Sequence, residues 1–206
     1  MSTARAEPSS RRVPSQERNR RRVEQILDAA ERLVVGHGVE ALTTREIARA
    51  AEVPVASLYQ YFADKEAVLL ALAARDMEEM DRQLADDLAG LTAPGVPEVV
   101  RTAVLAFVTV YHRRRAFVQI YLRGRTNVAV HEFGREHNRR IAETLLAYAR
   151  DTGLAGPGLT APVALLAVEV TDRLFQLAFE RDDDGDPLIL EEGIAMMTAY
   201  LERYAA

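Results

Sequence analysis

Residues 43–69 read TTREIARAAEVPVASLYQYFADKEAVL, and this stretch carries the signals of two short helices followed by the start of a third. Glu46 stands three positions after Thr43, which is the spacing of a capping box at the N-terminus of a helix. The residues at 52–54, EVP, interrupt the apolar helical period, which resumes at Leu58. The stretch therefore predicts a helix-turn-helix whose second helix is too short to be buried without support from its neighbours.

Helical signals continue on both sides of this stretch. Apolar positions repeat with a helical period from about residue 16 to residue 35, and Gly36 and Gly38 mark the end of that helix. Asp64 marks the start of a longer helix, which we expect to reach about residue 88. Residues 16–63 are therefore expected to form a three-helix domain, which the longer helix joins to the rest of the chain.

The remainder of the chain, residues 64–206, also has the pattern of a helical protein. Loops rich in glycine, proline or aspartate separate its apolar stretches, and no strand pattern or internal repeat is apparent. After the helix that begins at Asp64, we expect helices at about residues 98–112, 115–123, 128–150, 161–181 and 188–204. The sequence thus predicts an all-α fold with a small N-terminal domain and a larger C-terminal one.

Composition excludes several classes of protein. The chain has 206 residues, of which 49% are hydrophobic, so it can bury a sizeable core. It has no cysteine, which excludes disulfides, thiol nucleophiles and thiolate metal sites. Its apolar runs are short and flanked by charge, and no apolar segment of a signal peptide follows the N-terminal arginines, so we expect a cytoplasmic protein without a membrane span.

The helix-turn-helix stretch and its surroundings resemble the DNA-binding domain of the TetR family of bacterial transcriptional regulators. The resemblance covers roughly residues 16–72 and rests on five segments that occur in the same order. These are ILDAAERL at 26–33, GHG at 36–38, TTREIA at 43–48, LYQYF at 58–62 and DKE at 64–66. The chain departs from the family at Glu52, where glycine is common, and at Pro54, where a hydroxyl residue is common.

This resemblance implies the architecture and function of such regulators. Residues 16–63 would bind double-stranded operator DNA with an inverted repeat, and residues 64–206 would bind a ligand and a second copy of the chain. The last two helices would form the interface of the homodimer. The chain would then be a repressor, released from its operator by a small hydrophobic or amphipathic effector.

The family's pattern assigns the DNA contacts by role. Gln60 is suited to pair with adenine, and small apolar residues near it are suited to contact thymine methyl groups. Lys65, the only lysine of the chain, stands in the first turn of a helix, where free amides also favour an anion. The expected base contacts are Val55, Ala56, Gln60 and Tyr61, and the expected phosphate contacts are Thr44, Ser57, Tyr59 and Lys65.

The net charge of −5 is distributed unevenly along the chain. Arginines concentrate near the N-terminus, whereas Asp and Glu concentrate between residues 182 and 192. Residues 1–15 are rich in Ser, Pro and Arg without apolar periodicity, so we expect a disordered basic arm. This arm either reaches a minor groove of DNA or remains a solvated tail.

A ligand cavity is expected in the C-terminal domain because aromatic and polar side chains alternate on its predicted helices. The candidate ligand-binding residues are Phe107, Tyr111, His112, Phe117, Tyr121 and Phe175. Aromatic residues at helical spacing usually pack in a closed core, which is the competing interpretation for each of them. As a group they suggest a cavity, because three of them bring polar atoms into apolar helices.

Three other patterns suggest a metal or anion site, and each has a simpler interpretation. His131 and His137 are six residues apart, which turns them to different faces of a helix. Residues 180–191 place acidic side chains at several ligand positions of an EF-hand-like loop, but Pro187 interrupts it. The arginines at 113–115 lie between two predicted helices, where a solvated corner is expected. We therefore expect no metal site and no cofactor.

Two alternatives to a ligand-released repressor remain. The first is a constitutive DNA-binding regulator without a ligand. The second is a hydrolase that uses His112, His131 or His137 with nearby carboxylates. The chain has no Gly-x-Ser-x-Gly elbow and no phosphate-binding loop, so a regulator is expected and an enzyme is not.

Overall fold

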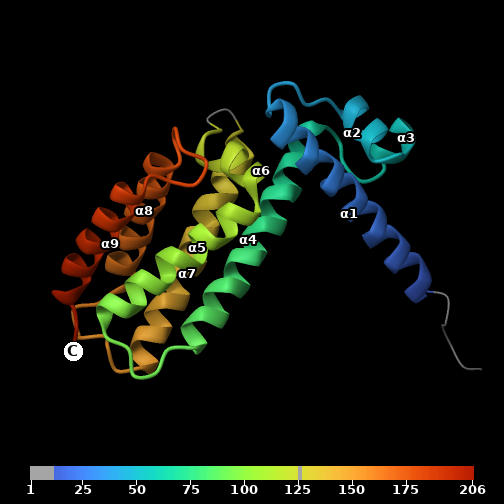
Figure 1. The fold of residues 1–206 in the computed structure, drawn as a ribbon. Helices are drawn as coiled ribbons and strands as arrows, with labels where there is room; N and C mark the ends of the chain where they lie inside the picture. The colour runs from blue at the N-terminus through green and yellow to red at the C-terminus, as the bar shows by residue number, and fades with distance from the viewer. Residues whose placement is uncertain (1–11, 125–126) are drawn as a thin grey trace, which may run out of the picture.

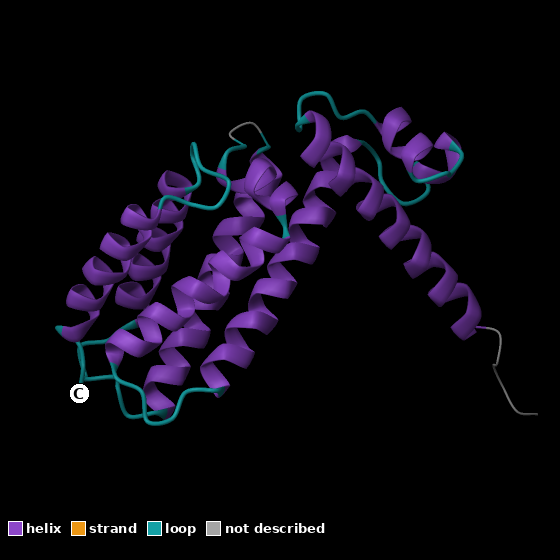
Figure 2. Ribbon diagram, in the orientation of Figure 1, coloured by secondary structure: helices purple, strands orange, loops and turns teal. Residues whose placement is uncertain are grey.

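The computed structural model describes residues 12–124 and 127–206, and all the regular elements within them are helices (Figures 1 and 2). An isolated bridge between Ala155 and Ala205 is the exception. The elements are α1 (Arg12–His37), α2 (Thr44–Ala50), α3 (Val55–Leu58), α4 (Lys65–Ala89), α5 (Val96–Arg113), α6 (Arg115–Phe117), the π-helix η1 (Val118–Leu122), α7 (Val128–Asp151), α8 (Ala161–Ala178) and α9 (Pro187–Glu202). The predicted all-α fold is confirmed.

The helix-turn-helix is built from local signals that the sequence already contains. The Thr43 hydroxyl caps α2 by accepting a hydrogen bond from the Glu46 amide at 3.2 Å, and it donates to the Glu46 carboxylate at 2.9 Å. The predicted cap is therefore present, although the carboxylate binds the hydroxyl of Thr43 instead of its backbone amide. In the turn, Glu52 adopts a φ of 54°, a left-handed conformation that glycine adopts with less strain than other residues.

Several helix boundaries differ from those expected. Helix α1 begins at Arg12, so residues 12–15 of the expected disordered arm belong to this helix, while residues 1–11 of the arm lie outside the described part of the chain. The helix expected at residues 115–123 is split into α6 and the π-helix η1. Helix α8 ends at Ala178 instead of residue 181, because the Ala178 carbonyl accepts a hydrogen bond from the Asp186 amide at 2.9 Å.

Helix α4 connects the two parts of the molecule. It starts beside the helix-turn-helix and runs into the C-terminal bundle, where it packs against α5 and α7 (Figure 1). Helices α8 and α9 pack against each other on the side of the bundle farthest from α3 (Figure 1). One continuous hydrophobic cluster extends from Ile26 in α1 through Leu72 in α4 to Met197 in α9. Movement in the bundle can therefore be transmitted to the helix-turn-helix through packed side chains.

An ionic network also joins α1 to the C-terminal bundle. On α4, Arg75 pairs with Asp28 at 2.7 Å and with Glu31 at 2.6 Å, both on α1. Between α5 and α6, Arg114 pairs with Glu79 at 2.7 Å and with Glu31 at 3.4 Å. Glu31 is thus shared by two arginines from different elements, so the network fixes the orientation of α1 on α4.

Asp76 lies at the centre of this network and is completely buried. Its carboxylate is 3.6 Å from the nearest guanidinium nitrogens of Arg75 and Arg114, and neither carboxylate oxygen has a hydrogen-bond partner within the described residues. Burial raises the pKa of Asp76 from 3.8 to about 7, although the two arginines oppose this shift. The folded protein therefore binds this proton more tightly than the unfolded chain does.

We expect the Asp76→Asn variant to change the pH dependence of stability. Between pH 3.8 and about 7 the folded state holds the Asp76 proton and the unfolded state has lost it, so the contribution of Asp76 to the free energy of unfolding falls as pH rises. The variant lacks this proton, and its stability relative to the wild type should increase with pH across that window. Urea unfolding at both ends of the window measures the difference. Asp86→Asn, an exposed change on α4, is the control, and an equal slope in that variant would contradict the assignment.

Candidate functional site

Helix α3 presents a mixed apolar and polar surface to solvent. Leu58 is completely buried, and it anchors this short helix on the core. Val55 is 37% exposed and Tyr59 is 52% exposed, and the side chains of Ala56 and Gln60 are also exposed. These four predicted contact residues therefore lie free of the core, as a recognition helix requires.

The predicted phosphate contacts Thr44 and Tyr59 lie side by side. The Thr44 hydroxyl and the Tyr59 hydroxyl are 3.1 Å apart and form a hydrogen bond between α2 and the end of α3. Ser57, also predicted as a phosphate contact, is half-buried. Two hydroxyl groups from different helices thus form one polar edge, which is suited to hold a phosphate oxygen.

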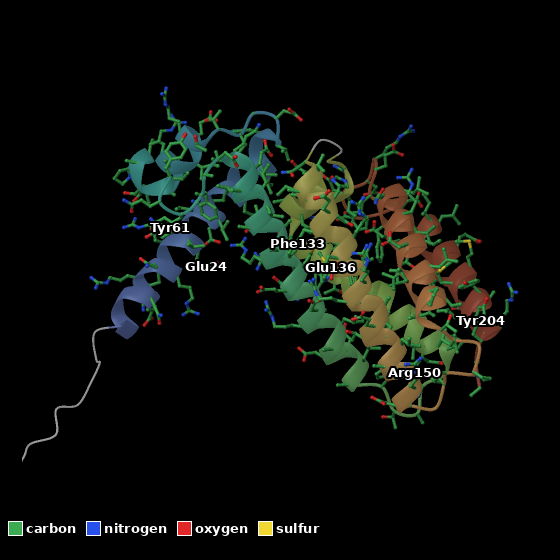
Figure 3. All side chains as sticks on the ribbon, turned by 180° about the vertical axis from the view of Figure 1, so that it is seen from behind. Glu24, Tyr61, Phe133, Glu136, Arg150 and Tyr204 are labelled. Atoms are coloured by element: carbon green, nitrogen blue, oxygen red, sulfur yellow. The ribbon has the colours of Figure 1, made fainter. Side chains whose placement is uncertain are left out.

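Tyr61 is placed differently from Gln60, although both were predicted to contact bases. Its side chain is half-buried, and its hydroxyl donates a hydrogen bond to Asn19 on α1 at 3.3 Å. Tyr61 therefore lies against α1 (Figure 3). A direct contact with a base edge requires this hydrogen bond to be exchanged.

Lys65 opens α4 at a helix N-terminus. Asp64 caps this helix by accepting a hydrogen bond from the Ala67 amide at 2.8 Å, and the Lys65 side chain is half-buried. Sequence reasoning missed Arg45, which is exposed in the first turn of α2 next to Thr44. The sequence contained a signal for this residue, because Arg45 directly follows the predicted phosphate contact Thr44 and a cation there would add to the attraction for the same phosphate.

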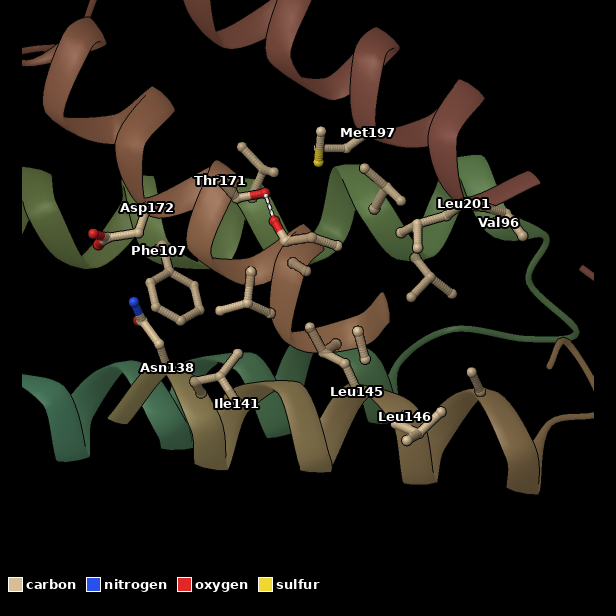
Figure 4. A pocket seen from close by; sticks show the side chains of 18 of the residues that line it. Val96, Phe107, Asn138, Ile141, Leu145, Leu146, Thr171, Asp172, Met197 and Leu201 are labelled. Carbon is tan, nitrogen blue, oxygen red and sulfur yellow. Dashed lines mark hydrogen bonds between the residues drawn. The ribbon is translucent and has the colours of Figure 1, made fainter. Parts of the chain in front are cut away.

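The C-terminal bundle contains a cavity of about 130 Å³ between α5, α7, α8 and α9 (Figure 4). Its wall is mainly aliphatic, and α5 contributes residues spaced three or four positions apart from Val96 to Tyr111. Residues at this spacing share one face of a helix, so the cavity follows α5 for roughly 20 Å. An elongated apolar space of this kind is suited to an apolar molecule.

Three of the six predicted ligand-binding residues line this cavity. They are Phe107, Tyr111 and Phe175. The rings of Phe107 and Phe175 are stacked, with centroids 5.9 Å apart, and the Tyr111 ring meets the Phe175 ring edge-on at 5.2 Å. These contacts close one end of the cavity with aromatic rings.

The other three predicted residues lie outside the cavity lining. His112 is exposed, and its Nε2 bonds to the Asp184 carbonyl oxygen at 2.8 Å. Phe117 is buried and stacks on the far side of the aromatic group, against Tyr111. Tyr121 packs on the backbone of α7 at Gly134, where an added Cβ would lie 2.3 Å from its ring. Helical periodicity could not separate these core and surface positions from the cavity wall.

The cavity also contains polar residues that sequence reasoning did not assign to it. Asn138 on α7 and Thr171 and Asp172 on α8 are part of the lining. The Thr171 hydroxyl donates to the Ala167 carbonyl at 2.8 Å and is therefore already satisfied within its own helix. In the sequence, each of these residues is a polar side chain on the apolar face of a helix. Assigning them to the cavity also requires knowing how α7 and α8 lie relative to each other.

Helices α8 and α9 expose large apolar side chains. Leu166 is 52% exposed and Leu177 is 40% exposed on α8, and Leu188 is 68% exposed and Met196 is 48% exposed on α9. Ile194 and Met197, which also lie on α9, are buried. The remaining exposed residues make the α8–α9 face the natural candidate for contact with another protein surface.

The patterns that suggested a metal site are engaged in other interactions. His137 bonds to Asp81 at 2.7 Å, and His131 bonds to the Asn127 carbonyl at 2.9 Å. In the acidic loop, Asp183 pairs with Arg123 at 2.7 Å. Among the residues that the structure describes, no group of three or more His, Asp or Glu is arranged to hold a metal ion. None of the helices in the same residues is long and apolar enough to cross a membrane.

Comparison with known families gives two matches that together cover most of the chain. Residues 26–72 match the model of bacterial regulatory proteins of the tetR family, and residues 95–201 match that of the tetracyclin repressor-like C-terminal domain. The first match contains the helix-turn-helix, and the second contains the cavity lining apart from Tyr204, together with the α8–α9 face.

Individual relatives agree with these matches. A TetR-family transcriptional regulator from Streptomyces coelicolor superposes with a TM-score of 0.66 at 30% identity, over 89% of this chain and 99% of that one. The fatty acid degradation regulator FadR from Bacillus halodurans superposes with a TM-score of 0.69 at 18% identity, over 86% and 94% of the two chains, and shares the fold. The HTH-type transcriptional regulator HbdR from Aromatoleum sp. (strain CIB) is 32% identical over 91 residues, which are 44% of this chain and 39% of that protein.

Proposed function

Because this chain belongs to the TetR family of bacterial transcriptional regulators, we propose that it is a repressor which leaves its operator when a small molecule fills the cavity of the C-terminal bundle. It acts in the cytoplasm as a homodimer, held together by α8 and α9, on an inverted-repeat operator. Residues 16–63 bind DNA, and residues 64–206 bind the effector and the partner subunit. The effector is hydrophobic or amphipathic, and the chain is a regulator and not an enzyme.

The observation that carries this proposal is the coexistence of a recognition surface and a cavity joined by packed helices. Helix α3 exposes Val55 and Tyr59, while the cavity lies in the bundle that α4 connects to it. If the effector favours a bundle in which the two α3 helices of a dimer no longer match successive major grooves, DNA binding weakens. Linkage then requires DNA to weaken effector binding by the same factor.

Substitutions on the DNA surface should separate phosphate contacts from base contacts. We expect Lys65→Ala to weaken binding to all DNA sequences and to lower the salt slope by about one unit, because one phosphate contact is lost. We expect Gln60→Ala to cost roughly 1–3 kcal/mol, mainly at one operator position, because a base contact is lost. Titrations of the operator and its single-position variants at several salt concentrations measure both effects. Equal, sequence-independent losses from the two variants would contradict the assignment.

A constitutive DNA-binding regulator is the second candidate, and the size of the cavity favours it. The volume of about 130 Å³ is smaller than the roughly 300 Å³ or more of typical ligand pockets. A ligand-released repressor therefore needs the bundle helices to move apart on binding. Operator binding in the presence of a broad set of apolar compounds distinguishes the two candidates, because a constitutive regulator responds to none of them.

A further inference from the structure

One end of the cavity is polar and the rest is apolar. Asn138 and Asp172 lie at the end near Phe107, while aliphatic residues such as Leu145 and Leu146 continue the wall toward Val96 (Figure 4). The lining therefore separates into a long apolar part and a short polar end. A ligand that matches this lining needs a long apolar part and a short polar head group.

Asn138 has an unsatisfied donor at this polar end. Its side chain is only 6% exposed, and its Nδ2 atom has no hydrogen-bond partner within the described residues. Buried amide groups are normally paired, so an unpaired one in the wall of a cavity calls for an acceptor from outside the chain. An acceptor atom on a bound molecule would supply it.

Asp172 provides an acceptor next to this donor. One of its oxygens accepts a hydrogen bond from the Gln176 amide at 2.8 Å, and the Tyr121 hydroxyl also hydrogen-bonds to it. The same hydroxyl lies near the Asn138 side chain, but outside hydrogen-bonding geometry with its Nδ2 atom, so both polar residues lie close to one atom. Burial raises the pKa of Asp172 to about 6, while the hydrogen bonds from Tyr121 and Gln176 favour its ionised form. Within the described part of the chain, no arginine or lysine forms an ion pair with this carboxylate.

The polar end thus offers one hydrogen-bond donor and one negatively charged acceptor. Resting on the proposed function, we infer that the effector is an elongated apolar molecule that ends in a neutral group able both to donate and to accept hydrogen bonds, such as a primary amide or an alcohol. Its acceptor atom pairs with the Asn138 amide, and its donor pairs with the Asp172 carboxylate. Its alkyl part lies along the aliphatic wall between α5 and α7.

Charged head groups fit this end less well. A carboxylate is repelled by Asp172, whose pKa is raised by burial and by the charge of Glu169 and lowered by that of His131. An ammonium group can pair with Asp172, but this attraction must offset the cost of taking the ammonium out of water. It also carries donors only, so it leaves the Asn138 donor without an acceptor. A neutral donor–acceptor group satisfies both residues and adds a third donor to the two that already stabilise Asp172.

Calorimetric titration of the full-length protein with four molecules of equal chain length tests this inference. The molecules are decanamide, decyl alcohol, decanoate and decylamine. We expect decanamide and decyl alcohol to bind at least about tenfold more tightly than the other two, because only they pair both polar residues. Decanoate or decylamine binding as tightly as decanamide would overturn the inference, and so would the absence of binding by all four.

Variants of the polar end provide a second measurement. We expect Asn138→Leu to weaken decanamide binding about tenfold, and Asp172→Asn to strengthen decanoate binding by at least about tenfold, because the repelling charge is removed. Asp86→Asn, an exposed change on α4, is the charge control and should leave the ranking unchanged. If the order of the four affinities is unchanged in Asp172→Asn, the role of this carboxylate is contradicted. If a variant does not fold, the order measured with the wild-type protein still decides the inference.

The inferred head group and the proposed release of the operator can be contradicted separately. The calorimetric titrations contain no DNA, so they test the head group alone. If the four molecules bind in the expected order but none of them changes operator affinity, the head-group inference stands and the proposed release is contradicted. Release of the operator by an unrelated compound, with no binding of decanamide, would contradict the head-group inference and leave the proposed function intact.

Discussion

Leu166→Glu is expected to dissociate the proposed homodimer and to reduce operator affinity by at least about a hundredfold. Leu166 is 52% exposed on α8, in the face that we propose as the dimer interface. A two-fold interface would bury this position in both subunits, so the variant introduces two unpaired carboxylates, each of which costs several kcal/mol. A monomer contacts only one half-site and loses the roughly 10²-fold or larger gain of binding two linked half-sites.

Analytical ultracentrifugation and operator titration measure the two parts of this effect. Leu105→Glu is the matched control, because Leu105 is 42% exposed but lies on α5, outside the α8–α9 face. We expect this control to remain a dimer and to bind the operator normally. A Leu166→Glu variant that stays dimeric with normal affinity would place the interface elsewhere.

Ala167→Leu is expected to make the proposed repressor insensitive to its proposed effector. Ala167 is 7% exposed on α8 and lines the cavity, so a leucine side chain occupies part of the space of about 130 Å³. Each lost methylene contact weakens an apolar ligand by about 0.8 kcal/mol, and three such losses raise the effector concentration needed for release by about fiftyfold. Operator affinity without effector should remain normal, because the leucine occupies space that is already open and does not need the bundle helices to move apart.

Dose–response curves of operator release for the variant and the wild type test this expectation. Ala161→Leu adds the same atoms at an exposed position at the start of α8 and serves as the control. Thermal unfolding of both variants shows whether the added atoms fit, because overpacking a core commonly costs about 1–3 kcal/mol. Full sensitivity in a stably folded Ala167→Leu variant would show that the effector binds elsewhere.

The helix-turn-helix could be predicted from sequence because its signals are local. The cap at Thr43, the turn at residues 52–54 and the new helix at Lys65 each depend on a few neighbouring residues. Exposure at Val55 and Tyr59 follows from the shortness of α3, which leaves only one side for the core. Tyr61 was less predictable, since its contact with Asn19 joins residues that are distant in sequence.

The cavity was harder to predict for a physical reason. Apolar side chains that line a cavity and those that fill a core have the same helical spacing, so Phe117 and Phe175 look equivalent in sequence although Phe175 lines the cavity and Phe117 does not. The polar pair of Asn138 and Asp172 comes from two helices, and its proximity depends on how α7 packs against α8. The π-helix η1 also has no local signal in the apolar segment that forms it.

The most direct measurement is the affinity of the full-length dimer for an operator selected from random duplex DNA, with and without a saturating ligand of the cavity. We expect an inverted repeat whose half-site centres lie about 34–36 Å apart or a multiple of that distance, bound at least about 10³-fold more tightly than shuffled DNA. Saturating ligand should reduce this preference, and operator DNA should reduce ligand affinity by the same factor. Equal affinity for selected and shuffled DNA, or an operator affinity that the bound ligand leaves unchanged, would contradict a ligand-released repressor.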